Sequence, residues 1–212
     1  MARGFRSSPQ GLRARLDADE RGLLGRLFRD IIGLLERDLD YQDAAAAEAP
    51  APDPLEALLG LDEAVEAPTD PAVARLLPAG TADEERAREF RRFTDRSLRE
   101  QKVAALRRAA LAVEQDPVVL DREAAVDFSR ALNDVRLVLS TRLGIESAED
   151  AERIESVSLK NVRDADSYMA VVYSFVSWMQ NSLIEAMLVE LPEQGPAGPA
   201  PGDGPAPGRD GG

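Results

Sequence analysis

Residues 17–39 read DADERGLLGRLFRDIIGLLERDL, and this stretch decides the fold class. Its apolar residues recur at steps of three and four, which places them on one face of a helix that packs on a core. Asp17 can cap the first turn, and Glu20 stands where a capping box requires an acid. The apolar stripe consists of Leu23, Leu24, Leu27, Phe28, Ile31, Ile32, Leu35 and Leu39. We therefore predict a long helix here.

Similar start signals open three further helices. Residues 53–54 and 70–71 are both Asp-Pro, and each pair precedes a short leucine-rich run. An aspartate cap followed by proline at the first helical position starts a helix well, because that N–H has no helical partner to lose. Thr81 and Glu84 form a second capping box, which predicts a long helix to about Val113.

This long helix contains the first candidate site. We expect its apolar face to carry Phe90, Phe93, Ala104, Leu111 and Ala112. The opposite face is expected to carry a basic row of Arg88, Arg92, Arg96, Arg99 and Lys102. Five cations on one face make a candidate anion surface. Acidic residues interleave with the row, however, so we favour a solvated face with ion pairs between residues four apart.

Two more amphipathic helices follow. Asp121 caps the first, and Gly144 can end it as a glycine C-cap. Its core stripe is Phe128, Leu132, Val135, Leu139 and Leu143. The inner positions of the last helix are Tyr168, Val172, Phe175, Val176, Met179, Leu183 and Met187. The wide apolar coverage of this last helix indicates a central helix of the bundle or a contact with another chain.

The segment ALNDVRL, residues 131–137, is the second candidate site. On a helical wheel Arg136 and Arg142 flank the apolar stripe, and Asp134 lies well round from it. An arginine at such an edge can keep its head in water or bind a carboxylate of a neighbouring helix. We also expect a charge ladder on the outer face formed by Asp127, Arg130 and Asp134. Asn133, Asp134, Arg136 and Arg142 are therefore candidate partner-binding residues, although packing and ion pairing explain them more simply.

A small β element is also expected. Residues 12–16 alternate apolar and basic side chains, the period of a short strand. Residues 118–120, Val-Val-Leu, follow an Asp-Pro turn signal and are the candidate partner strand.

Together these patterns predict a mainly α, single-domain helical bundle of about five to seven helices with a two-stranded β element. Residues 1–191 form the helical domain, with a flexible linker at about 42–52, where QDAAAAEAPAP lacks aromatics and periodicity. Residues 192–212 are rich in proline and glycine and cannot bury enough surface to offset the entropy of ordering. We expect this tail to be disordered.

Composition excludes several classes of function. The 212 residues include 39 acidic and 26 basic side chains, a formal charge of −13, which makes nucleic acid an unlikely main partner. The chain has no cysteine and no histidine, so disulfides, thiolate nucleophiles, Ser-His-Asp triads and histidine-bound zinc are excluded. Carboxylate sites for magnesium or calcium remain a formal option, but no such motif is present. We expect no catalytic residue, no cofactor and no metal site.

The location is expected to be cytoplasmic. Arg3, Arg6, Arg13 and Arg15 make the N-terminus basic, but no apolar stretch follows as a secretory signal requires. The charge-free segment 167–184 approaches the length of a membrane span, yet it contains several polar side chains. We therefore expect no membrane insertion.

Several segments resemble an actinobacterial family of unknown function over about residues 12–191. They are LDADERGLLGRL, DPLEALLGL, DPAVARLLP, REQKVAALRRAALAVE and ALNDVRLVLSTRLGI, of which the ALNDVRL part is the most specific. Family members are typically encoded beside the proteolysis adaptor ClpS and near a metal-dependent isopeptidase-type hydrolase, and some are labelled transcriptional regulators. Ser140 stands where the family often has glycine, and Phe128 where tryptophan is usual. Both differences look like packing changes.

The resemblance and the lack of recognisable chemistry imply a non-catalytic interaction or regulatory protein, an accessory to Clp-dependent proteolysis with ClpS or the Clp machinery as protein partner. The alternative is a transcriptional regulator, which requires a helix-turn-helix with a basic recognition helix. A third class, a carboxylate–metal enzyme, predicts a cluster of buried acids. A homo-oligomer is compatible with each of these.

Overall fold

The computed structural model describes residues 3–48, 66–155 and 162–189, and it is mainly α-helical. Within these ranges it has six helices and one three-stranded antiparallel sheet. The elements in chain order are β1 (Arg3–Ser8), β2 (Gly11–Arg15), α1 (Ala18–Glu48), α3 (Pro71–Leu76), α4 (Glu84–Ala112), β3 (Val118–Leu120), α5 (Arg122–Arg142), α6 (Ala148–Glu155) and α7 (Ala165–Val189). The predicted fold class is confirmed, and the β element has one strand more than predicted.

The capping box predicted for α1 is confirmed. The Asp17 N–H donates to Glu20 Oε2 at 2.8 Å, and the Glu20 N–H donates to Asp17 Oδ1 at 3.0 Å. The predicted stripe supplies the buried side chains Leu24, Phe28, Ile31 and Leu35. Residues 42–48, which the sequence assigned to a flexible linker, instead continue α1 as helix. The rest of that linker, the helix expected after residues 53–54 and the tail at 192–212 lie outside the described residues.

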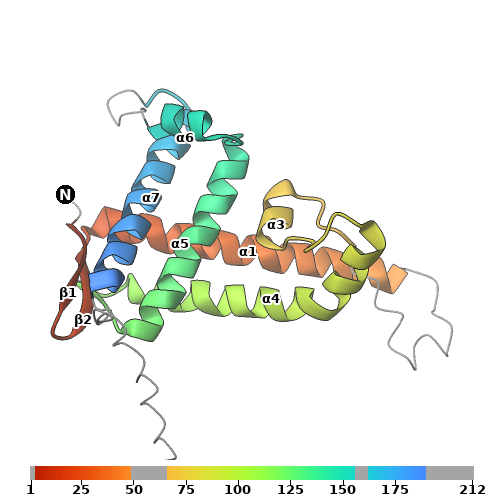
Figure 1. Cartoon of the computed structure of the whole chain (residues 1–212), viewed down its shortest axis with the longest axis horizontal. Coiled ribbons are helices and arrows are strands. Elements are labelled where there is room, and N and C mark those ends of the chain that lie inside the picture. Colours follow the sequence, from red (N-terminus) through yellow and green to blue (C-terminus); the bar gives the residue numbers. More distant parts are fainter. Residues whose placement is uncertain (1–2, 49–65, 156–161, 190–212) are drawn as a thin grey trace, which may run out of the picture.

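Helices α1 and α4 pack side by side and run antiparallel along the length of the molecule (Figure 1). The cap of α4 is Asp83, whose side chain accepts the Arg86 N–H at 2.9 Å. Thr81, the predicted cap, accepts the Asp83 N–H at 3.3 Å instead. The predicted helix is therefore confirmed, but its cap lies two residues later than expected.

The face that α4 buries differs from the prediction. Phe90, Phe93 and Leu111 were expected to be inside, but they are 43%, 67% and 62% exposed. The buried residues are Ala87, Arg91, Asp95, Arg99, Ala105, Leu106, Ala109 and Ala110. The first half of the buried face carries the charged residues Arg91, Asp95 and Arg99. A prediction that places the large apolar residues inside therefore chooses the wrong face of α4.

The central element is α5. It packs on α1, α3, α4, α7 and the strands β2 and β3, and its predicted stripe is buried from Phe128 to Leu139. The helix ends at Gly144, whose φ of +65° suits glycine, as the sequence predicts. For the last helix the sequence indicated either a central place in the bundle or a contact with another chain. The helix is not central, since α7 packs on α5, α6, β1 and β2 and leaves Trp178 42% exposed; the contact with another chain stays a prediction.

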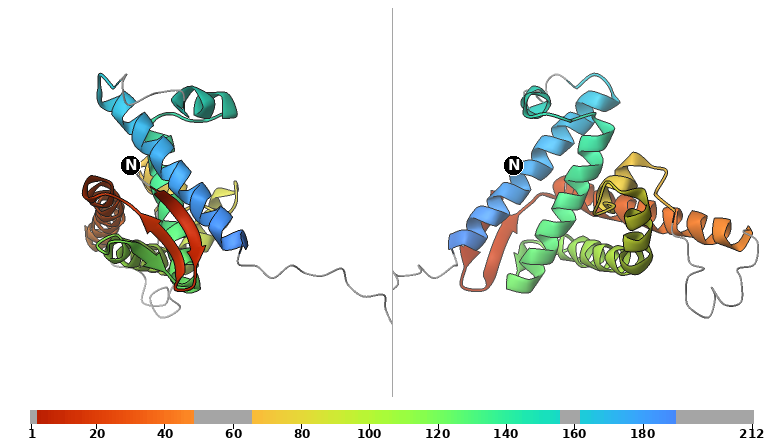
Figure 2. Two further views of the ribbon diagram at one scale, coloured as in Figure 1. Left: turned by 90° about the vertical axis from the view of Figure 1, so that its left-hand side faces the viewer. Right: turned by 45° about the vertical axis from the view of Figure 1, so that its right-hand side comes forward.

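The sheet closes one end of the molecule beside the C-terminal end of α7 (Figure 2). The two predicted strands pair antiparallel, with Leu12 opposite Leu120. The unpredicted strand β1 pairs with β2 and rests on α7, where the Phe5 N–H donates to Ser182 Oγ at 3.1 Å. Gly4 permits this approach, since a Cβ there would lie 2.7 Å from Ser182 Cβ.

Three aromatic rings join the sheet to the helices. Phe128 of α5 makes edge-to-face contacts with Phe5 of β1 and Phe28 of α1, at centroid distances of 5.5 and 5.6 Å. All three side chains are at most 4% exposed. The sheet, α1 and α5 therefore share one core.

None of the described helices combines the length with the apolar character that a bilayer crossing requires.

Candidate functional site

A groove of about 450 Å³ lies between α4 and α5 beside Gln180 of α7, and most of the residues that line it are polar. It contains part of the ALNDVRL segment. The α4 side contributes Leu98, Gln101, Lys102 and Ala105, the α5 side Ser129, Arg130, Asn133 and Asp134, and α7 contributes Gln180. We call this set of residues the α4–α5 groove. Its volume falls within the range of ordinary ligand sites, about 300–1,000 Å³.

An ion pair lines the groove. Lys102 Nζ of α4 lies 2.7 Å from Asp134 Oδ1 of α5, and Asp134 is only 2% exposed. Burial raises the pKa of the Asp134 carboxyl above its ordinary value, and the nearby Lys102 ammonium offsets part of that rise. Of the predicted charge ladder, the pair between Asp127 and Arg130 forms, at 3.5 Å, whereas Asp134 binds Lys102 instead of Arg130. The ladder does not lie on an outer face, because Asp127 is only 5% exposed and also binds Arg108 of α4 at 2.7 Å.

Gln180 fixes the α7 side of the groove. Its Oε1 accepts a hydrogen bond from an Arg136 terminal nitrogen at 2.7 Å, and its Nε2 donates to the Ser129 carbonyl at 3.3 Å. The Arg136 guanidinium also lies 5.8 Å from the centroid of the Tyr173 ring. Arg136 therefore links α5 to α7 through an amide and an aromatic ring, whereas the sequence left open a head group in water or a carboxylate partner.

Two amide side chains of the groove have no internal role. Asn133 on α5 and Gln101 on α4 are exposed, and neither has a hydrogen-bond partner among the described residues. Each amide offers two donors and a carbonyl acceptor. The groove thus combines a fixed polar wall with two amides that can bind a ligand bearing both donors and acceptors.

Arg142 lies elsewhere. Its terminal nitrogen is 2.5 Å from Asp70 Oδ2, so it holds the start of α3 against the far end of α5. Burial would raise the pKa of Asp70, but hydrogen bonds from Arg142 and from the backbone of Ala72 and Val73 outweigh it and lower that pKa. The structure therefore places Asn133 and Asp134 in the α4–α5 groove. Arg136 is outside the lining but binds its residue Gln180, and Arg142 lies at the C-terminal end of α5 beside Asp70.

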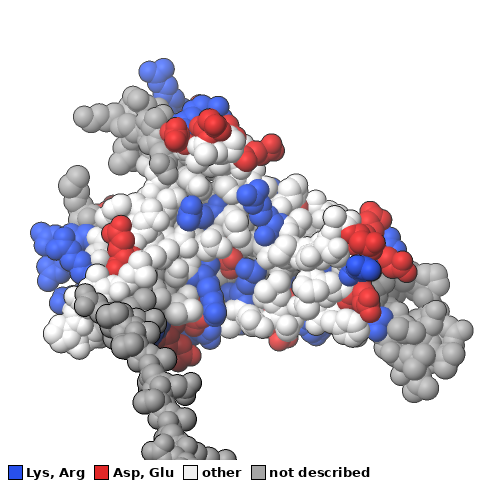
Figure 3. All heavy atoms as spheres, viewed as in Figure 1, with Lys and Arg blue, Asp and Glu red and all other residues white. Residues whose placement is uncertain are grey.

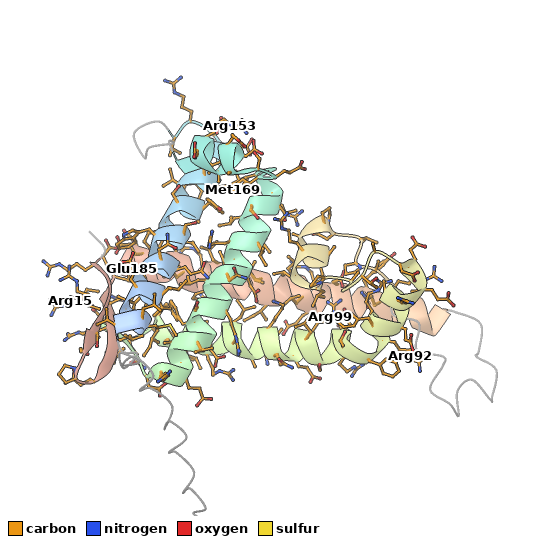
Figure 4. All side chains as sticks on the ribbon, viewed as in Figure 1. Arg15, Arg92, Arg99, Arg153, Met169 and Glu185 are labelled. Carbon is orange, nitrogen blue, oxygen red and sulfur yellow. The ribbon has the colours of Figure 1, made fainter. Side chains whose placement is uncertain are left out.

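The basic row of α4 does not share one face. Arg99 is 3% exposed and lies between α1 and α4, whereas Arg92 lies nearer the start of α4 (Figure 4). Arg99 donates to Asp95 at 2.5 Å, to Asp38 at 2.7 Å and to the Leu35 carbonyl at 3.1 Å. Lys102 faces the groove, Arg92 lies 4.9 Å from the Phe93 ring centroid, and Arg88 and Arg96 are exposed. The anion-surface hypothesis thus retains three of its five members on the surface.

The sequence reading missed several groove and interface residues. Gln101, Ser129 and Gln180 are polar residues on helices whose neighbours the sequence does not specify. Asp95 had a usable signal, because Arg91, Asp95 and Arg99 recur every four residues and so share one face of α4. Charges of alternating sign at a spacing of four residues can form ion pairs along one helix face, and here that face is buried.

The acidic side chains of the described ranges form no group of three or more placed to hold a metal ion.

Comparison with known proteins gives one match. A family model described as "Domain of unknown function (DUF2017)" matches residues 2–187, most of the chain. No curated protein and no solved structure matches significantly.

Proposed function

The chain belongs to the DUF2017 family, and we propose that it is a non-catalytic interaction protein whose α4–α5 groove binds a polypeptide segment of a partner. One observation carries this proposal. Asn133 and Gln101 face solvent beside the groove without an internal hydrogen bond, although the neighbouring side chains of Lys102, Asp134 and Gln180 are paired.

The chemistry of the groove fits a polypeptide backbone. Its ionised groups have partners, Lys102 with Asp134 and Arg130 with Asp127, so they do not select a strongly charged ligand. Amide side chains can both donate to peptide carbonyls and accept from peptide N–H groups. A segment laid between α4 and α5 would satisfy both kinds of group at once.

A finer proposal concerns the partner. The resemblance of the ALNDVRL segment supports an accessory role in Clp-dependent proteolysis, with ClpS or a Clp chaperone as the bound protein. That support is an analogy between proteins rather than a contact in this chain. The proposal that the groove binds a partner is therefore independent of the proposal that this partner is ClpS or a Clp chaperone.

Site-specific crosslinking in the native host tests the interaction. A photo-crosslinking residue at position 133 should capture a partner protein, whereas the same residue at Asn181, an exposed amide of α7 outside the groove, should not. Capture at both positions, or only of the chain itself, would contradict the groove as the binding site.

A binding titration with purified proteins tests the finer proposal. ClpS should bind the full chain, and Asn133→Ala should weaken binding by about tenfold, the result of losing roughly 1.4 kcal/mol. Asn181→Ala is the matched control and should leave the affinity unchanged. If ClpS and the Clp chaperones do not bind while position 133 still captures another protein, the interaction survives and the Clp assignment fails.

The alternative, a transcriptional regulator, has weaker support. A recognition helix must present its basic residues to the DNA groove. Arg99 and Lys102, the C-terminal members of the basic row, are engaged with Asp38 and Asp134. Sequence-specific binding to host DNA at about 150 mM salt would favour this alternative over the interaction proposal.

A further inference from the structure

The N-terminal hairpin carries four arginines that the groove does not use. Arg3 and Arg6 lie on β1, Arg13 and Arg15 on β2, and the antiparallel register sets Arg3 opposite Arg15 and Arg6 opposite Arg13. The apolar residues of both strands are buried, and alternate residues of a strand point to opposite faces, which places Arg6, Arg13 and Arg15 on the outward face. Arg3 is only two residues from the buried Phe5, but an irregularity in the register between Arg3 and Arg6 sets Arg3 opposite Arg15 and so on the same face. Basic side chains gather at this end of the molecule (Figure 3).

This arrangement has an energetic cost in the free protein. Like charges directly opposite each other on neighbouring strands repel and destabilise a hairpin. None of the four arginines forms an ion pair with an acidic side chain of the described residues. An anion bound between the strands would remove the repulsion.

A cavity of about 580 Å³ adjoins these strands, lined by Arg3, Arg13 and Arg15 together with Leu16, Asp17, Asp116 and Pro117. We call it the hairpin cavity. Basic side chains outnumber acidic ones in its lining. The Asp116 carboxylate is moreover already 3.0 Å from Arg21, which is outside the lining. The cavity therefore has a surplus of positive charge.

Arg13 is the central member of the group. It lies between Arg6 of β1 and Val119 of β3, and its Nε is buried with no acceptor among the described residues. A buried donor without a partner destabilises the free protein. No protein acceptor holds this guanidinium in one orientation, so it can turn toward a ligand oxygen.

We propose that the hairpin cavity is a binding site for a phosphate group, contacted by Arg13, Arg15 and Arg3. Guanidinium groups bind phosphate oxygens in pairs of parallel hydrogen bonds. Directly opposed Cα atoms on neighbouring strands are about 4.5–5.5 Å apart, so two of these side chains can reach one phosphate. The charge of a phosphate monoester, about −1.5 to −2 at neutral pH, suits the positive surplus.

A protective role is the competing explanation for the arginines. Charged residues on edge strands prevent pairing with other chains. The β1 edge, however, is already covered by α7 through the Phe5–Ser182 hydrogen bond. The central strand β2, which is paired on both sides, also carries two of the four arginines. Edge protection therefore leaves half of the cluster unexplained.

Calorimetric titration of the full chain tests the site, with inorganic phosphate and ribose 5-phosphate as separate probes at constant ionic strength. We expect saturable binding of one phosphate group per chain. Arg15→Gln and Arg13→Gln should each weaken it about tenfold or more, the loss of one charge-assisted contact of about 1.5–3 kcal/mol. Tighter binding of the ester than of free phosphate would identify a phosphorylated small molecule as the ligand, and equal binding would identify the free anion.

Arg96→Gln is the matched control, because it removes one exposed arginine of α4 and changes the net charge equally. It should leave both affinities unchanged. Arg13→Lys keeps the charge and removes the planar fork, so it should weaken binding even if Arg13→Gln disturbs the sheet. The absence of saturation, or equal weakening by Arg96→Gln, would overturn the proposal. Neither result bears on the α4–α5 groove.

Discussion

Arg99 of α4 forms buried ion pairs with an acid on α1 and an acid on its own helix. Its place in a basic row predicted exposure, but it is 3% exposed and binds two carboxylates and a backbone carbonyl. The two carboxylates belong to Asp38 on α1 and Asp95 on α4, and both side chains are at most 9% exposed. Asp95 has little contact with bulk water and Asp38 only slightly more, so water compensates poorly for the loss of the guanidinium.

Arg99→Met is expected to destabilise the protein strongly. It keeps a long apolar side chain but leaves two buried carboxylates without their cation, which costs about 3–5 kcal/mol. Urea unfolding at pH 7 measures the change. Arg96→Met, on the exposed face of the same helix, should change the free energy of unfolding by less than about 0.5 kcal/mol. Similar effects of the two substitutions would show that Arg99 is not buried in solution.

At the scale of the element, α3 depends on its contacts for stability. Its six residues are too few to be helical alone, since isolated helices are marginal below about 12 residues. Asp70 caps it by accepting the Ala72 N–H at 2.8 Å and also binds Arg142 of α5. A single carboxylate therefore both starts the helix and docks it.

Asp70→Asn separates these two roles, because asparagine still caps but cannot form the ion pair. We expect a loss of up to about 1 kcal/mol at pH 7, measured by urea unfolding and by hydrogen exchange of the α3 amides. The pKa of Asp70 is lowered in the folded state, so its contribution is present above the ordinary value of 3.8 and is lost as pH falls through the folded pKa. The difference between wild type and variant should therefore vanish on acidification.

Asp70→Ala supplies the comparison, since it removes the cap as well. It should cost about 1 kcal/mol more than Asp70→Asn. A difference between wild type and Asp70→Asn that grows toward acid pH would mean that the carboxylate does not bind Arg142 in solution.

At the scale of the whole molecule, one core joins the sheet to the helices. The ring of Phe128 contacts the rings of Phe5 and Phe28, which come from the sheet and from α1. α5 lies far from β1 and α1 in the sequence, so the aromatic contacts couple the N-terminal elements to the middle of the chain. We expect the described elements to unfold together.

Phe128→Ala is expected to cost about 3–5 kcal/mol, because it removes buried apolar surface and leaves a cavity. Thermal unfolding followed by circular dichroism should show a single transition, lowered by roughly 2–4 °C per kcal/mol. Phe93→Ala removes a ring that is 67% exposed and should have little effect. A second transition in the variant would indicate that α1 and α4 fold independently of α5.

The sequence by itself determined the elements with local signals. The capping box at Asp17 and Glu20, the leucine stripe after it and the glycine C-cap at Gly144 depend on neighbours a few residues away. It also picked out Asn133 and Asp134, which the fold brings to one groove. Strand β1 was not predicted, because its sequence RGFRSS shows no clear alternation of apolar and polar residues. Besides its pairing with β2, this strand contacts α7 at Gly4 and Phe5.

Only the tertiary structure decided which face of α4 is inside and that Asp127 and Asp134 of α5 are buried. The buried face of α4 contains Arg91, Asp95 and Arg99, so its charges are compensated partly by Asp38, more than 50 residues away. The burial of Asp127 and Asp134 follows in the same way from Arg108 and Lys102 on a different helix. A charged side chain is buried only where an oppositely charged partner lies next to it. The position of that partner depends on the fold rather than on the local sequence.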